Sequence, residues 1–198
     1  MSDRKAQLYD IIRVCAIWLL MLLPAMTAYA DDDARAWSAL RDGSAVLMLR
    51  HALAPGTGDP ANFTLGDCST QRNLNEQGRE QARAWRSYLA GHGITRARVY
   101  SSQWCRCMET AKGMDVGPVT PWPALNSFFR NRSEGGMATR TTISLVNELD
   151  AGAPVILVSH QVNITALTGV YPASNEGVII ALPLSDNPTV LARVTPVS

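Results

Sequence analysis

The chain has 198 residues, a formal net charge of +1, and charged side chains at 18% of its positions. This length suits one α/β domain with a sizeable core, and the composition excludes a disordered chain, a collagen-like chain and a disulfide-dense miniprotein. General nucleic-acid binding needs a concentrated basic face. The balanced charge therefore predicts no nucleic-acid partner, and any recognition of anions must be local.

The first 30 residues have the order of a secretory signal peptide. Basic residues precede an apolar run at 14–23, and Ala28-Tyr29-Ala30, with small residues at both ends, leads into an acidic stretch. The apolar run is shorter than the roughly 20 residues that a membrane span requires. We therefore predict cleavage after Ala30, a periplasmic or secreted protein without a membrane span, and a single domain over residues 31–198. An uncleaved membrane anchor is the alternative.

Hydrophobic periodicity and turn residues predict an alternation of helices and strands through most of the chain. In order, the predicted elements are a helix at 31–42, a strand at 45–51, a helix that follows an Asn75 cap and runs to Leu89, a strand at 98–102, helices at 103–112 and 141–149, a strand at 154–160, a helix at 162–169, and strands at 177–182 and 189–194. Three prolines between residues 118 and 125 allow an edge strand at best. This alternation predicts an α/β fold with three layers, α/β/α, around a largely parallel sheet.

Two long connections are candidate walls of a binding site. The loop from residue 54 to about residue 73 is of a length that is usually functional, and Thr57 with its flanking glycines offers a hydroxyl and backbone N–H groups to an anion. A plain surface loop is the alternative. Phe128 and Phe129 lie in a second predicted loop, at 126–136, where they either face the substrate or pack beneath the loop.

Three cysteines remain after the predicted cleavage, and export places them in a compartment where a disulfide persists. We predict that Cys68 pairs with Cys105 or with Cys107, which ties the long loop to the helix at 103–112. A metal site is the weaker interpretation. The Cys-x-Cys spacing does not suit a zinc knuckle, and no nearby histidine completes a ligand set, so we expect no metal and no cofactor.

Two of the chain's three histidines occupy the same position, at the end of a buried strand. His51 follows Arg50 there, His160 ends a later strand, and Arg106 lies near the start of the helix that follows the strand at 98–102. Ligands of open α/β sheets bind outside the carboxyl ends of the strands. We therefore expect these four side chains to converge, with the two arginines gripping an anion such as a phosphoryl group.

At these positions the sequence resembles the histidine phosphatase superfamily, in its phosphoglycerate-mutase-like branch. The matching motifs follow the family's order and cover about residues 45 to 170: Leu49-Arg50-His51, Leu74-Asn-Glu-Gln-Gly78-Arg-Glu-Gln81-Ala82, Ser101-Ser102-x-x-x-Arg106-x-x-Glu109-Thr110-Ala111 and Val158-Ser159-His160. The resemblance implies a phosphoglycerate-mutase-like fold and a small phosphorylated substrate.

The resemblance also implies a covalent mechanism. His51 attacks phosphorus to form a phosphohistidine, while Arg50, Arg106 and His160 stabilise charge on the transferring oxygens, and water then hydrolyses the intermediate. The residue types agree with this, because flanking cations disfavour protonation of His51 and so keep its imidazole nucleophilic.

The sequence departs from the family at the leaving-group acid. Asn126 stands where many relatives have a glutamate, and an amide does not donate a proton in that role. Glu134 and His160 are the candidate replacements. Gln161 and Asn163 stand where glycines are common, and we predict that both contact the substrate, as does Thr57.

We therefore predict an exported phosphatase that hydrolyses phosphomonoesters, with a sugar phosphate or a phosphorylated envelope glycan as the candidate substrate. One alternative is a non-catalytic module that binds phosphate with the same residues but has lost turnover. Another is a phosphoprotein or phosphohistidine phosphatase, which fits the missing acid because the phosphohistidine bond is labile. The intact pair His51 and His160 favours an enzyme.

Overall fold

The structure is a computed structural model that describes residues 33–196. Contacts divide the chain into Met1–Arg35 and Ala36–Ser198, and the second unit holds the fold described below. The predicted signal peptide, with its cleavage after Ala30, lies outside the described residues.

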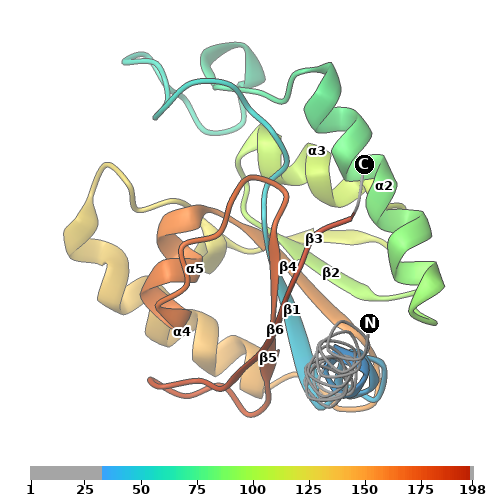
Figure 1. Ribbon diagram of the computed structural model, residues 1–198. Helices are drawn as coiled ribbons and strands as arrows, with labels where there is room; N and C mark the ends of the chain where they lie inside the picture. Colours follow the sequence, from blue (N-terminus) through green and yellow to red (C-terminus); the bar gives the residue numbers. More distant parts are fainter. Residues whose placement is uncertain (1–32, 197–198) are drawn as a thin grey trace, which may run out of the picture. The chain divides into compact units, whose positions relative to one another are not determined.

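A six-stranded sheet forms the centre of this unit (Figure 1), in the order β3-β2-β4-β1-β5-β6. Its strands are β1 (Ala45–Arg50), β2 (Arg98–Ser101), β3 (Val119–Pro121), β4 (Val155–Ser159), β5 (Gly177–Ala181) and β6 (Val190–Val194). The strands β1 to β4 pair in parallel, whereas β5 pairs antiparallel with both β1 and β6. Only β5 therefore runs against the other described strands, which confirms a largely parallel sheet. The proline-rich β3 lies at its edge, as expected.

Helices cover both faces of the sheet. They are α2 (Glu76–Gly91), α3 (Cys105–Gly113), α4 (Gly135–Asn147) and α5 (Gln161–Thr168), with residues 33–41 also helical and short 3-10 helices at η1 (Cys68–Thr70), η2 (Pro123–Leu125) and η3 (Arg132–Glu134). Figure 1 shows α2 and α3 on one side of the sheet and α4 and α5 on the other. Within residues 33–196, no helix combines the length and the apolar character needed to cross a bilayer.

Alternate residues of β1 are buried in two separate apolar clusters. Leu47 and Leu49 pack in the cluster that contains Trp85 of α2. Val46 and Met48 pack in the cluster that contains side chains of α4 and α5. Because successive side chains of a strand point to opposite faces, this division places the sheet between two helical layers. The predicted three-layer α/β/α architecture is confirmed.

The helix α4 begins earlier than predicted. The glycine pair at 135–136 predicted a loop and a helix start at 141, but α4 begins at Gly135. A side chain at Gly135 would meet the ring of Phe128, with its Cβ 3.0 Å from that ring. Glycine at position 135 thus leaves room for the ring of Phe128 against the first turn of α4.

The start of α2 is fixed against the segment that follows β1. The Asn75 side chain accepts a 2.8 Å hydrogen bond from the amide of Gly78, which confirms the predicted cap. Gln81 accepts a 2.9 Å bond from the amide of Leu53, two residues beyond His51. The motif around Gly78 thus holds α2 beside the end of β1.

Candidate active site

The carboxyl ends of three neighbouring strands bring the predicted residues together. His51 follows β1, His160 follows β4, and Arg106 lies in the first turn of α3, which follows β2. Because β4 pairs in parallel with both β1 and β2, their carboxyl ends are adjacent. A cavity of about 330 Å³ at this edge is lined by Arg50 together with the other three residues. The predicted convergence is present.

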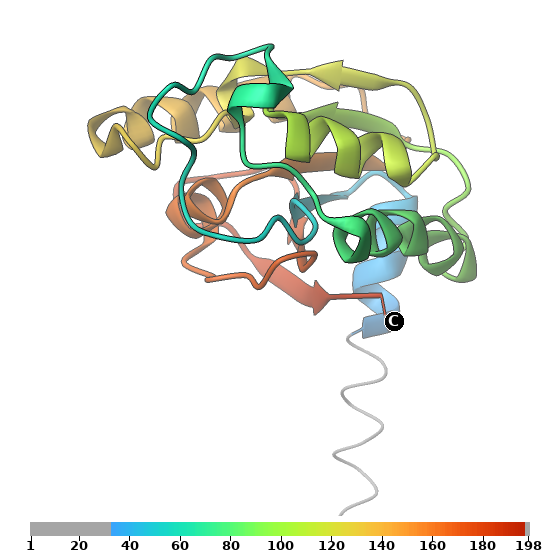
Figure 2. The same cartoon turned by 90° about the horizontal axis from the view of Figure 1, so that it is seen from above.

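The long loop between β1 and α2 forms much of the cavity wall. In Figure 1 this loop (teal) lies beyond the end of β1, and in the view from above (Figure 2) it lies toward the viewer. It contributes Thr57 to the cavity lining, as predicted, together with Asp59, Phe63 and Arg72. The loop is therefore part of the site.

His51 is a buried, neutral imidazole whose Nε2 keeps an unprotonated lone pair. Its Nδ1 lies 2.8 Å from the carbonyl oxygen of Ala52. Because a carbonyl oxygen only accepts hydrogen bonds, Nδ1 carries the proton and Nε2 keeps its lone pair. Burial, followed by the charge of Arg106, lowers the pKa of His51 to about 3. The imidazole is therefore unprotonated at neutral pH, as the flanking cations predicted.

The guanidinium of Arg106 lies at the centre of the site and is 3% exposed. Its Nε donates to Nε2 of His51 at 3.2 Å, and its Nη2 lies 3.4 Å from Nδ1 of His160. Its Nη1 and Nη2 also bind the carboxylate of Asp59, at 2.7 and 3.2 Å. Arg106 thus links the two histidines to an acidic residue that the sequence did not single out.

His160 is held from behind by a chain of hydrogen bonds. Its Nε2 lies 2.8 Å from the hydroxyl of Ser102, which in turn donates to the side-chain oxygen of Asn126 at 3.2 Å. The backbone amide of Gln103 also donates to the side-chain oxygen of Asn126 at 2.8 Å, and the side-chain amide of Asn126 donates to the side-chain oxygen of Gln103 at 2.8 Å. Asn126 therefore orients His160 through Ser102. Burial, followed by the charges of Arg106 and of His51, lowers the pKa of His160 well below its ordinary value.

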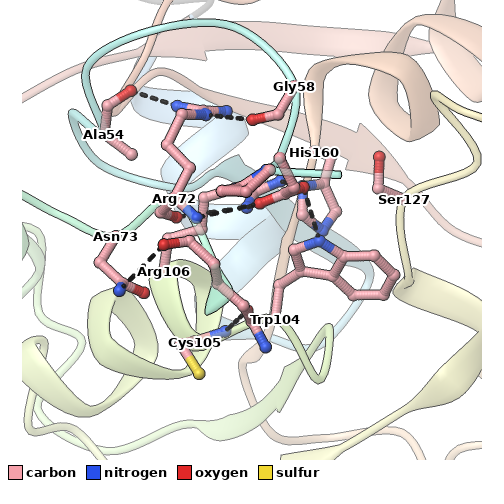
Figure 3. Close-up of polar contacts among 12 residues, drawn as sticks. Ala54, Gly58, Arg72, Asn73, Trp104, Cys105, Arg106, Ser127 and His160 are labelled. Carbon is pink, nitrogen blue, oxygen red and sulfur yellow. Dashed lines mark hydrogen bonds and ion pairs between the residues drawn. The ribbon is translucent and has the colours of Figure 1, made fainter. Parts of the chain in front are cut away.

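A third arginine, Arg72, also lines the cavity. Arg72 donates to the carbonyls of Gly58, at 2.7 Å, and Ala54, and Figure 3 shows it reaching across the loop to both. Sequence reasoning missed Arg72, and its place in the long functional loop was the available signal. Arg50 donates to the carbonyl of Pro172 at 2.9 Å, but its buried Nε has no partner within residues 33–196.

Of the residues predicted to contact the substrate, some line the cavity and one does not. Gln161 lines the cavity, as Thr57 does. Asn163 is absent from the lining, and its amide donates instead to the carbonyl of Asn126 at 2.9 Å. This contact gives Asn163 a role in holding the segment behind His160.

In the second predicted loop, at 126–136, only some of the candidate residues reach the cavity. Phe129 lines the cavity and is 41% exposed, whereas Phe128 is buried against the start of α4. Glu134, a candidate acid, is absent from the lining, and its carboxylate accepts from the side chain of Asn131.

An aromatic pair walls the cavity beside His160. The rings of Phe63 and Trp104 stack with their centroids 4.9 Å apart, and Trp104 meets His160 edge-on at 5.4 Å. Figure 3 shows Trp104 and Arg106 close to His160. These rings give the polar end of the cavity an apolar side.

The disulfide joins Cys68 to Cys105, which resolves the alternative that the sequence left open. It ties the long loop to the residue directly before Arg106. Cys107 is free and buried, and burial raises the pKa of its thiol to about 12. This thiol is therefore protonated and inert. Within the described part of the chain, no group of three or more His, Cys, Asp or Glu side chains is arranged to hold a metal ion.

The sequence profile of the histidine phosphatase superfamily (branch 1) matches residues 46–149, just over half of the chain. The chain belongs to the histidine phosphatase superfamily. No match was found among curated protein sequences.

Solved structures of other histidine phosphatase-fold proteins are similar to this one in fold. The protein histidine phosphatase SixA, complexed with tungstate, matches with a TM-score of 0.55 and 21% identity over 77% of this chain and 97% of its own. Phosphoserine phosphatase from Entamoeba histolytica, in complex with 3-phosphoglyceric acid, gives 0.52 and 12% identity over 76% and 96%. A mycobacterial glucosyl-3-phosphoglycerate phosphatase with inorganic phosphate gives 0.51 and 15% identity over 78% and 98%.

Proposed function

We propose that this protein is a metal-independent phosphatase that transfers a phosphoryl group first to His51 and then to water. The observation that carries the proposal is the neutral, buried imidazole of His51, whose Nε2 faces the guanidinium of Arg106 beside His160. Four arginines but one carboxylate line the cavity, so its lining is strongly positive, which suits a phosphoryl dianion.

The proposed reaction has two steps. In the first, the lone pair of His51 Nε2 attacks phosphorus in line with the leaving group, an N–P bond forms, and the bond from phosphorus to the leaving oxygen breaks, so that this oxygen departs as an anion and takes a proton from solvent. In the second, water attacks the phosphohistidine, the N–P bond breaks, and inorganic phosphate leaves with the imidazole neutral again. The arginines hold the equatorial oxygens in both steps, where their fixed charge stabilises the transition state.

A second candidate, a phosphohistidine or phosphoprotein phosphatase, is favoured by the state of the polar groups around the cavity. Asp59 is the one carboxylate in its lining, and the amide of Asn126 is engaged with Gln103 and Ser102. Neither group offers a proton to a departing alkoxide. Phosphoryl bonds with good leaving groups, phosphoramidates among them, need no such donor.

We propose that the natural substrate is met outside the cytoplasm. The signal-peptide pattern of residues 1–30 and a disulfide that persists in an oxidising compartment both support export. A periplasmic or secreted location favours a sugar phosphate or a phosphorylated envelope glycan. A mature N-terminus at Asp31, read by mass spectrometry, would support this location, and an intact N-terminus on the exported protein would contradict the cleavage.

Purified mature protein tests the activity with three substrates: an activated aryl phosphate, an alkyl phosphate and a phosphoramidate. We expect release of phosphate from the first and third without added metal, and His51→Ala to abolish it. Radiolabelled substrate should leave an adduct that is acid-labile and alkali-stable, and His51→Ala should lack it. The matched control is His92→Gln, because His92 stacks on Trp37 and does not line the cavity.

The panel also separates the candidate functions. Efficient hydrolysis of the alkyl phosphate would favour a general phosphomonoesterase, whereas activity confined to the aryl phosphate and the phosphoramidate would favour the second candidate. A wild type that binds inorganic phosphate but releases none from any of the three substrates would instead indicate a non-catalytic phosphate-binding module.

A further inference from the structure

Asp59 is the one carboxylate in the cavity lining, and both of its oxygens are fully occupied. Oδ1 accepts from Nη1 of Arg106 at 2.7 Å and from the backbone amide of Arg72 at 3.1 Å. Oδ2 accepts from Nη2 of Arg106 at 3.2 Å and from the indole of Trp104 at 3.1 Å. Four donors therefore converge on one carboxylate, and its ion pair with Arg106 is almost wholly buried.

The guanidinium of Arg106 presents two different edges. Its outer edge, Nη1 and Nη2, binds Asp59, whereas its side edge, Nε and Nη2, is directed at Nε2 of His51 and Nδ1 of His160, at 3.2 and 3.4 Å. A guanidinium is planar and rigid, so fixing the direction of one edge fixes that of the other. A phosphoryl group can bind the side edge while Asp59 keeps the outer edge.

We propose that Asp59 is a positioning residue that aims the side edge of Arg106 at the phosphoryl group between the two histidines. This inference rests on the proposed function, because it assigns Asp59 a part in the same phosphoryl transfer. It also assigns a residue to a part of the site for which the sequence motifs named none.

The same contacts exclude Asp59 as the leaving-group acid. A carboxyl group that carries a proton would have to give up at least one of its four donors. Burial alone would raise the pKa of Asp59, but the hydrogen bonds and charge of Arg106 lower it below its ordinary value, as do the amide of Arg72 and the indole of Trp104. Asp59 is thus an ionised acceptor in the resting site.

The backbone beneath Asp59 is held as firmly as its side chain. Arg130, from the segment before α4, donates to the carbonyl oxygens of both Asp59 and Pro60. The Cys68–Cys105 bridge fixes the same loop to the start of α3 further along the chain. The carboxylate is therefore preorganised before any substrate arrives, which a positioning role requires.

Four variants test the inference: Asp59→Asn, Arg106→Ala, their combination, and the matched control Asp67→Asn. Asparagine keeps the volume of Asp59 but turns one acceptor into a donor that faces Arg106 and Trp104. Asp67 lies on the same loop, where its carboxylate accepts from Ser69 and where asparagine caps equally well. Binding of inorganic phosphate, measured by calorimetry, and kcat and KM for an aryl phosphate are the readouts, with thermal unfolding as the check of folding.

We expect Asp59→Asn to lower kcat/KM roughly 10- to 100-fold, mostly through kcat, because a misdirected Arg106 loses contact with the transition state. Phosphate binding should weaken too, whereas Asp67→Asn should match the wild type. In the Arg106→Ala background, Asp59→Asn should no longer weaken phosphate binding, because an unpaired Asp59 carboxylate there repels the anion. A simple structural role does not produce this dependence on Arg106.

Two outcomes would overturn the inference. One is an Asp59→Asn variant that binds phosphate as tightly as the wild type does. The other is a loss of phosphate affinity by the same factor whether Arg106 is present or replaced by alanine. If Arg106→Ala does not fold, Arg106→Lys takes its place, since lysine keeps the charge but has no second edge. The phosphate-binding arm does not require turnover. A wild type without activity would therefore refute the proposed function while the role of Asp59 could still be read from binding.

Discussion

The two imidazoles of the site are kept neutral by the same surroundings that make the cavity attractive to an anion. Burial and the charge of Arg106 act in the same direction on His51 and on His160, because each disfavours a positive imidazolium. In the unfolded chain, both rings titrate near the ordinary value of about 6.5. The neutrality of these two imidazoles in the folded state therefore makes the fold sensitive to acid.

We predict that stability falls as the pH drops below about 6.5, because the unfolded chain then takes up a proton at His51 that the folded chain, with a pKa of about 3, does not. Above that pH the ring is neutral in both states and contributes no pH dependence. The slope approaches about 1.4 kcal/mol per pH unit for each such histidine. Thermal unfolding between pH 7 and pH 5 should show a shallower dependence for His51→Gln than for the wild type. Parallel curves would contradict the depressed pKa.

At this scale, the sequence predicted the residues that directly follow strands and missed those that depend on the path of a loop. Arg50, His51 and His160 are placed by strand ends, which hydrophobic runs predict well. Asp59 and Arg72 reach the cavity only because the loop folds back across the sheet edge, and no periodicity encodes that path.

Among the elements, α2 has the most demanding fit, because its first turn touches the backbone that leads away from His51. A Cβ on Gly78 would lie 2.1 Å from the carbonyl oxygen of Leu53, well inside any normal contact. Glycine therefore allows the helix to approach closely enough for Gln81 to bind the amide of Leu53. The family-like motif at this helix start thus has a steric and hydrogen-bonding cause.

We predict that Gly78→Ala destabilises the protein by about 1–3 kcal/mol, because the backbone must move apart to admit the methyl group. Gly91, at the other end of α2, is the matched control, since a Cβ there meets nothing within 4 Å. Gly91→Ala should be neutral or stabilising by up to about 0.5 kcal/mol. Denaturant unfolding of both variants measures the difference, and equal effects at the two positions would refute the close-packing argument.

The sequence predicted the elements with clear apolar periods and misplaced the boundary of α4. Two consecutive glycines indicate a turn when read locally. The packing of Phe128 against Gly135 is a tertiary contact that local propensity does not contain. Elements whose ends are set by such contacts are the ones that sequence patterns misjudge.

At the scale of the whole molecule, one disulfide bond fixes the long loop of the site to the start of α3. The Cys68–Cys105 bridge closes a segment with a sequence separation of 37, which contains Arg72, and it anchors the end of the long loop in which Asp59 precedes Cys68. The odd number of cysteines left the pairing open at the level of sequence. In the structure, Cys107 is buried in the apolar cluster that contains Trp85 and is not available to Cys68, which pairs with Cys105.

We predict that removing the bridge weakens the site and the fold together. A Cys68→Ser, Cys105→Ser double variant should lose about 3–4 kcal/mol of stability, the scale expected for a loop of this length. Phosphate affinity should fall as well, because the loop residues are no longer preorganised. A reductant should reproduce both losses in the wild type and leave the double variant unchanged. Full affinity after reduction would show that the loop holds its place without the bridge.

The overall architecture was predictable because alternating elements constrain an α/β sheet strongly. The reversed direction of β5 was less accessible, since apolar runs near the end of the chain do not reveal which way a strand runs. The position of the site at the carboxyl ends depends only on the parallel strands β1, β2 and β4, so it could be predicted without knowing the direction of β5.

The hydrogen bond from Arg106 to Nε2 of His51 has a consequence for selectivity. In the resting site that N–H points at the Nε2 lone pair of His51, so the guanidinium of Arg106 stands in the way of an electrophile that approaches this atom. Under the proposed function, the oxygens of a bound phosphoryl group compete for the same N–H and leave the lone pair available, whereas a neutral electrophile has no group that competes for it. We therefore expect His51 to react with phosphoryl compounds and to resist neutral alkylating agents.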